Sequence, residues 1–315
     1  MTEEAIERAL SGDARALARL VSLVENGAPE LRAVMKALAP LTGRARVIGL
    51  TGAPGVGKST VTAALVGAYR ARGLRVGVLA VDPTSPFSGG ALLGDRVRMQ
   101  DHATDPGVFI RSMASRGHLG GLSAATPQAL RVLDAAGFGA VLIETVGVGQ
   151  AEVEIASLAD TTLVLAAPGM GDAIQAAKAG ILEVGDIFVV NKRDHPGAQE
   201  TVRDLRTMIA MARLGEQDWK PPIVTTMATV GDGIADLAAA VDAHGSWLDS
   251  SGERDRRRRA RAREEVAAIA VAALRQRMGG LPGDARLDSL AARVAAGELD
   301  PYSAADELVA AASVG

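Results

Sequence analysis

The chain has 315 residues, of which 48% are hydrophobic and only 3% aromatic, which is enough for one large domain with an aliphatic core and helical appendages. The absence of cysteine excludes disulfides, thiolate zinc sites and cysteine nucleophiles. The net charge of −3 argues against nucleic-acid binding, and the lack of a run of about eighteen apolar residues argues against a membrane span. The acidic, amphipathic N-terminus is unlike a signal or transit peptide, so we expect a cytoplasmic protein.

The first forty residues repeat apolar side chains at spacings of three and four, which predicts two or three amphipathic helices within residues 3–40. Asp13 precedes one of these helices and is expected to cap it. Two interpretations stay open: a helical collar packed on the core, or a surface that docks a partner.

A phosphate-binding loop follows. Residues 46–51 form an apolar, β-branched run that predicts a buried strand, and residues 60–72 have helical spacing and end at Gly73. Between them lies G-x-x-x-x-G-K-S, whose backbone N–H groups cradle phosphates together with the helix N-terminus. Lys58 is expected to act on the β- and γ-phosphate oxygens as a catalytic residue, and Ser59 to bind Mg²⁺. The nucleotide-contacting residues expected here are Gly52, Ala53, Pro54, Gly55, Val56, Gly57, Lys58, Ser59 and Thr60.

Two acidic residues follow the second predicted strand, residues 74–81. Asp82 ends this strand, and Asp95 comes after a segment rich in Pro, Ser and Gly. Open α/β sheets bind ligands at the carboxyl ends of their strands. We therefore expect Asp82 and Asp95 to hold Mg²⁺ or the attacking water.

A third acidic residue ends the strand predicted at residues 140–145, in the segment E-T-V-G. In P-loop enzymes an acidic residue here organises Mg²⁺ through water, and the glycine three residues later places its amide on the γ-phosphate. Glu144 and Gly147 are assigned these roles. The expected metal set is Ser59, Asp82, Asp95 and Glu144.

The rest of the middle segment alternates strands and helices. Strands are predicted at residues 108–113, 161–167, 186–190 and 222–227, and helices at 126–136, 173–182, 199–214 and 233–244, with a glycine-rich loop at 117–123. This alternation predicts an α/β fold, a three-layer P-loop NTPase with a mostly parallel central sheet and helical extensions at both ends.

Asn191-Lys192-Arg193-Asp194 matches N-K-x-D, a guanine-reading motif, directly after a strand. The Asp194 carboxylate can accept hydrogen bonds from the N1–H and the exocyclic amine of guanine, a donor pair that adenine lacks. Asn191 is expected to brace the loop, and the Lys192 stem to cover the base. Thr226, Met227 and Ala228 end the last strand and are expected to offer backbone amides to the guanine O6.

The composition changes after residue 250. A long helix is predicted at residues 253–276, and two short helices at 287–296 and 303–311. The arginine-rich beginning of the long helix could bind RNA or membrane phosphates, but its acid–base pairs at i,i+4 favour a solvated face or one that meets an acidic partner. The predicted organisation is an N-terminal extension at 1–43, a GTPase domain at 44–250 and a helical arm at 251–315, which is too small for its own core and packs either on the GTPase domain or on a second subunit.

Five segments resemble the MeaB/ArgK/MMAA group of GTPases: GLTGAPGVGKST, VDPTSPFSGGALLGDRVRM, IETVGVGQAE, NKRD and LDPYSAADEL. The resemblance spans nearly the full length, with departures at Phe87, Ala91 and residues 226–228. It implies a homodimer held by C-terminal helices and a chaperone of adenosylcobalamin-dependent acyl-CoA mutases, chiefly methylmalonyl-CoA mutase. GTP, hydrolysed to GDP, would gate cofactor loading or protect the mutase.

Three other functions stay open. A nickel-insertion GTPase needs a His/Cys cluster, whereas His102, His118, His195 and His244 are scattered along the chain. A P-loop kinase of a basic amino-acid transport system, an older label for such proteins, would need a basic lid that binds the phosphate acceptor. A nucleotide-locked binding module would bind GTP without hydrolysing it.

Overall fold

The computed structural model of the protein describes residues 3–82, 99–102, 104–114, 125–145, 151–169, 183–211, 215, 217–277 and 285–312. The expected helix at 173–182, the glycine-rich loop at 117–123, Asp95 and Gly147 lie outside these residues. The chain divides into two compact units, Met1–Arg254 and Asp255–Gly315.

Seven parallel strands form the sheet of the first unit, in the order β3-β2-β4-β1-β5-β6-β7. Their bounds are β1 Arg46–Gly52, β2 Val76–Asp82, β3 Val108–Ala114, β4 Ala140–Thr145, β5 Thr161–Ala166, β6 Ile187–Val190 and β7 Ile223–Thr225. Every residue of β4, β5 and β6 is buried, as parallel strands covered on both faces require. The expected α/β fold is confirmed, and the described sheet is parallel throughout.

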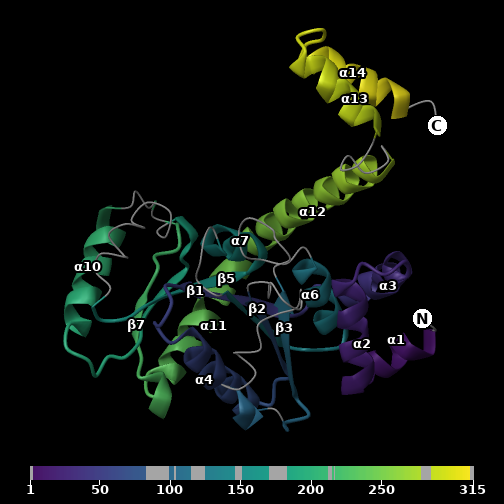
Figure 1. Ribbon diagram of the computed structural model, residues 1–315. Helices are drawn as coiled ribbons and strands as arrows, with labels where there is room; N and C mark the ends of the chain where they lie inside the picture. The colour runs from purple at the N-terminus through teal and green to yellow at the C-terminus, as the bar shows by residue number, and fades with distance from the viewer. Residues whose placement is uncertain are drawn as a thin grey trace. The chain divides into compact units, whose positions relative to one another are not determined.

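Helices cover both faces of this sheet, so the fold has three layers (Figure 1). On one face, α4 (Lys58–Ala71) and α11 (Ile234–Ser250) pack against side chains such as Ile48 and Leu50. On the other face, α6 (Thr126–Ala135) and α7 (Ala151–Leu158) pack against Val47 and its neighbours, and α10 (Ala198–Met211) packs against β5 and β6. Val47 and Ile48 enter opposite clusters because successive side chains of a strand point to opposite faces.

Three helices differ from the sequence prediction. Helix α7 was not predicted; it lies close against β1, where a Cβ at Gly49 would come within 2.7 Å of Ile155 Cγ1. Helix α11 runs six residues beyond the expected end at His244, because its buried face continues to Leu248. Helix α4 begins at Lys58 rather than Thr60, so the lysine itself belongs to the first helical turn.

The N-terminal helices are α1 (Glu3–Leu10), α2 (Ala14–Glu25) and α3 (Leu31–Leu38). Asp13 caps α2 as expected, since its Oδ1 accepts hydrogen bonds from the backbone N–H groups of Arg15 at 2.9 Å and Ala16 at 3.0 Å. Leu17, Leu20 and further apolar residues of these helices are buried in one cluster with α6. This packing fits the helical-collar interpretation.

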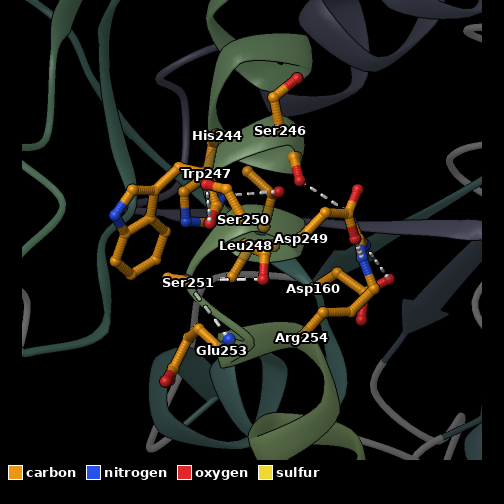
Figure 2. Close-up of polar contacts among 12 residues, drawn as sticks. Asp160, His244, Ser246, Trp247, Leu248, Asp249, Ser250, Ser251, Glu253 and Arg254 are labelled. Atoms are coloured by element: carbon orange, nitrogen blue, oxygen red, sulfur yellow. Dashed lines mark hydrogen bonds and ion pairs between the residues drawn. The ribbon is translucent and has the colours of Figure 1, made fainter.

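A polar network fastens the end of α11 and the start of α12 (Glu253–Arg277) to the beginning of β5 (Figure 2). Arg254 donates to Asp249 Oδ1 at 2.5 Å, to the carbonyl of Gly245 at 2.9 Å and to the buried Asp160 Oδ2 at 3.4 Å. Nδ1 of the fully buried His244 lies 2.8 Å from Thr161 Oγ1, within hydrogen-bond distance. The network lies at the amino end of the strand, away from the phosphate-binding loop.

The second unit contains most of α12, followed by α13 (Ala285–Ala295) and α14 (Pro301–Ala312). Leu290, Ala304 and Leu308 form its small core. Asp300 caps α14, and hydrogen bonds from the Ser303 hydroxyl and backbone N–H hold the pKa of its carboxyl below the ordinary value. Across the described helices, none has both the length and the apolar composition needed to cross a membrane.

Candidate functional site

The phosphate-binding loop connects β1 to α4. Gly52, Gly55 and Gly57 have φ values of 140°, 81° and 94°, a region in which side chains other than glycine are strained. A Cβ at Gly52 would also clash with the carbonyl oxygen of Leu165, and one at Gly57 with the side-chain amide of Asn191. Gly57 is the N-cap of α4 and offers no side-chain cap, so the N–H groups of the first helical turn face the loop. This helix N-terminus therefore has a backbone geometry suited to an anion.

Lys58 lies inside this loop, and only 7% of the residue is exposed. Its Nζ donates hydrogen bonds to the carbonyls of Gly52 at 2.8 Å and Ala53 at 3.1 Å. The loop thus positions the ammonium group in the concave part of its own backbone. A phosphate placed there would meet one fixed positive charge and the N–H groups of the helix.

Two hydroxyl groups of α4 hold the buried carboxylate at the end of β4. Ser59 Oγ donates to Glu144 Oε1 at 2.6 Å, and Thr62 Oγ1 lies 3.2 Å from Glu144 Oε2. Only 4% of Glu144 is exposed, so hydrogen bonds replace its lost hydration. A serine that donates its proton to Glu144 can still offer its oxygen lone pairs to a cation, which fits the expected Mg²⁺ ligand.

The other expected acidic residues are described only in part. Asp82 ends β2 and pairs with Ala114, and its side chain lies outside the described part, as do Asp95 and Gly147. β2 is the direct neighbour of β4, with Val81 opposite Thr145. The backbone of Asp82 is therefore one strand away from Glu144 at the carboxyl edge of the sheet.

Asn191 joins the two halves of the site. Its Nδ2 donates to the carbonyl of Val56 in the phosphate-binding loop at 2.9 Å, and its Oδ1 accepts from Thr226 Oγ1 at 3.1 Å and from the Ala228 N–H at 3.2 Å. Asn191 is 3% exposed. The expected bracing role is therefore visible in the geometry, and it extends from the phosphate loop to the end of the last strand.

Lys192 and Asp194 follow in the same loop. Lys192 has a left-handed φ of 59°, and its Nζ donates to the carbonyl of Gly55 at 2.9 Å. The side chain of Asp194 is 51% exposed, with His195 Nε2 at 3.8 Å from its Oδ2. The lysine stem thus crosses to the phosphate loop, and the Asp194 carboxylate stays accessible to a ligand.

The backbone amides at the end of β7 already have protein acceptors. Thr226 N donates to the Val190 carbonyl at 2.9 Å, Met227 N to the Asp232 carbonyl at 2.9 Å and Ala228 N to Asn191 Oδ1. A contact from one of these amides to guanine O6 would have to replace a bond that the protein makes. The contribution of residues 226–228 that the structure records is to hold Asn191.

Sequence reasoning missed three contributors to the site. Thr62 lies one helical turn after Ser59 on the same face of α4, a spacing that could have indicated it. An ion pair joins Arg193 of the N-K-x-D loop to Asp232, and their 39-residue separation carries no local signal. Among the described residues, no three His, Cys, Asp or Glu side chains gather as a separate metal site.

Comparisons with known proteins identify the family. The family model described as "Methylmalonyl Co-A mutase-associated GTPase MeaB" matches residues 17–281. A putative GTPase of Pyrococcus abyssi is 47% identical over 311 residues, covering 98% of this chain and 96% of the relative. The mitochondrial methylmalonic aciduria type A homolog of Caenorhabditis elegans is 32% identical over 266 residues, covering 79% of this chain and 67% of the relative.

A solved structure supports the same assignment. The crystal structure of an LAO/AO transport system kinase matches with a TM-score of 0.73 and 26% identity, covering 98% of this chain and 97% of that one. Fold, phosphate loop, N-K-x-D loop and these similarities lead to one conclusion: the chain belongs to the MeaB family of P-loop GTPases, enzymes that bind and hydrolyse GTP.

Proposed function

We propose that this GTPase is a chaperone of an adenosylcobalamin-dependent acyl-CoA mutase, of the methylmalonyl-CoA mutase type. GTP binding and hydrolysis would gate loading of the mutase cofactor or protect the mutase from inactivation. The observation that carries this proposal is the match of the mutase-associated family over residues 17–281. The similarity to a methylmalonic aciduria type A homolog supports it.

The phosphate end of the site would work through charge and position. The glycine loop, Gly52 to Gly57, and the N–H groups of α4 would bind the β- and γ-phosphates, and Lys58 would exchange its two carbonyl acceptors for phosphate oxygens. Phosphoryl transfer to water depends mainly on positioning and electrostatic stabilisation, so these groups supply most of what the chain must provide.

Mg²⁺ would be held by Ser59, with Glu144 beside it and Asp82 and Asp95 as further acidic groups at the same edge of the sheet. The ion supplies positive charge that stabilises the transferring phosphoryl group. Glu144 accepts the Ser59 hydroxyl proton in a hydrogen bond and so orients the serine oxygen. Gly147 would place its amide on the γ-phosphate.

The base end would select guanine. The Asp194 carboxylate would accept the N1–H and the exocyclic amine, Asn191 would fix the loop and Lys192 would cover the base. Residues 226–228 would contribute at the O6 side. Adenine would leave the carboxylate without its donor pair, which costs binding free energy.

The remaining features of the proposal concern assembly. The exposed apolar side chains of α12, Val266, Ile269, Val271 and Leu274, support a homodimer formed through residues 251–315. Residues 1–43 would be the N-terminal extension and residues 44–250 the GTPase domain. We place the protein in the cytoplasm, without nucleic-acid or membrane partners.

The test is the affinity of the purified protein for an adenosylcobalamin-dependent mutase of the same source, measured with a non-hydrolysable GTP analogue and with GDP. If the mutase favours the GTP-bound form, linkage requires tighter binding in the analogue than in GDP. Equal affinity in both nucleotides, or no binding in either, would contradict the proposal.

A second candidate is a kinase of a basic amino-acid transport system, favoured by the likeness to the LAO/AO transport system kinase. Transfer of the labelled γ-phosphate from GTP to a transport protein, rather than to water, would support it. Release of all label as inorganic phosphate would exclude it.

A further inference from the structure

Two loops meet at the base end of the site, and an ion pair joins them. The guanidinium of Arg193, the variable residue of the N-K-x-D loop, contacts the carboxylate of Asp232. The backbone of the same segments is also joined: Arg193 N donates to the Thr226 carbonyl at 3.0 Å, and Met227 N donates to the Asp232 carbonyl at 2.9 Å. Met227 and Asp232 form an isolated antiparallel bridge that closes the turn between them.

The loop that this pair fastens contains a strained residue. Lys192 is the only non-glycine residue with positive φ in the described part of the chain, at 59°. Such a conformation persists only where the surrounding structure holds it. Arg193 lies between Lys192 and Asp194 in the chain. The contacts that hold Arg193 therefore also affect the position of the Asp194 carboxylate.

We propose that Arg193 and Asp232 are positioning residues for guanine recognition. Neither touches the base; together they hold the loop so that both Asp194 oxygens face the two guanine donors. The inference rests on the proposed recognition of guanine by Asp194 and adds two residues that position this carboxylate. A bidentate contact depends on geometry, so a small displacement of the carboxylate would lose the second hydrogen bond before the first.

ITP distinguishes the two hydrogen bonds to Asp194, because its base keeps the N1–H of guanine and lacks the exocyclic amine. In the wild-type protein the second bond to a charged acceptor should favour GTP over ITP by about 10- to 100-fold. Loss of the ion pair should reduce this ratio by about two- to fivefold, the range that a half-exposed pair supports. The ratio is unaffected by the fraction of protein that is folded.

The experiment measures competitive binding of GTP and ITP to the full-length wild type, R193A, D232A and the double variant. The matched control is D242A. Asp242 and Asp232 have side chains that are both 38% exposed, and Asp242 pairs with Arg46 and Arg72 away from the base loops.

We expect each single variant to lower the GTP:ITP ratio, the double variant to lower it no further than either single one, and D242A to keep the wild-type ratio. Unchanged ratios in both single variants would overturn the inference and leave the proposed guanine recognition intact. Additive losses in the double variant would have the same consequence. A wild type without preference for GTP over ITP would overturn the guanine reading and this inference together.

Discussion

Replacing Asn191 by alanine should remove the hydrogen bonds that connect the phosphate-binding loop to the end of the last strand, and so lower the stability of the protein. The side chain makes three hydrogen bonds at 2.9, 3.1 and 3.2 Å, and the residue is 3% exposed, so its removal leaves three buried polar groups without their protein partner. A buried hydrogen bond contributes about 1 kcal/mol net. The three bonds together predict a loss of about 3 kcal/mol in the free energy of unfolding, a large part of the total for a typical domain.

Urea unfolding of the nucleotide-free protein, followed by tryptophan fluorescence, measures this loss. Both tryptophans, Trp219 and Trp247, lie in the first compact unit and report its unfolding. Thr226→Val is the matched control because it removes one of the three bonds, and it should cost about 1 kcal/mol. If N191A destabilises the protein no more than T226V, Asn191 does not brace the two halves of the site.

Three further outcomes are expected. Thr62→Val removes one of the two hydroxyl contacts to Glu144, so the Mg²⁺ concentration for half-maximal GTP hydrolysis should rise about fivefold. Asp194→Asn should weaken GTP binding at least about tenfold and strengthen XTP binding, as measured by nucleotide competition. The Arg70 hydrogen bonds, with the Gly107 N–H, hold the pKa of Asp105 below its ordinary value of 3.8. The stability from this pair should be present above about pH 4 and be lost as pH falls further, so D105N should flatten the acid limb of the urea-unfolding profile.

The fold and the phosphate loop were predictable because their signals are local. A buried strand, a glycine loop with lysine and serine, and a helix follow one another directly in the sequence from Arg46. The alternation of apolar runs and amphipathic segments likewise predicted all seven strands. Such patterns depend on periodicity and on turn residues, which a single sequence displays.

Other features were hidden because they depend on distant contacts. Helix α7 spans only eight residues, and Ile155 is buried against β1 because Gly49, more than a hundred residues earlier, leaves room for it. The pair of Arg193 and Asp232 exists only because the turn after β7 folds back on the N-K-x-D loop. No local propensity encodes either arrangement.

The sequence also could not show that the backbone N–H groups of residues 226–228 already have acceptors within the protein, because these acceptors lie in other segments. The sequence indicated a loop beside the base, and its position is as expected after β7. The acceptors of its N–H groups include Asn191 Oδ1, from a segment 37 residues earlier, and the Asp232 carbonyl, from the turn that follows. Only the folded chain shows which of these donors are already engaged.

The most direct test of the proposed function is the steady-state rate of GTP hydrolysis as purified adenosylcobalamin-dependent mutase from the same source is added. A lone P-loop domain without a supplied arginine finger hydrolyses GTP slowly, and a partner that orders its catalytic loops accelerates it. We expect the rate to rise with mutase concentration and to saturate. A rate that stays flat while the mutase is in excess would contradict the chaperone proposal and favour the kinase alternative.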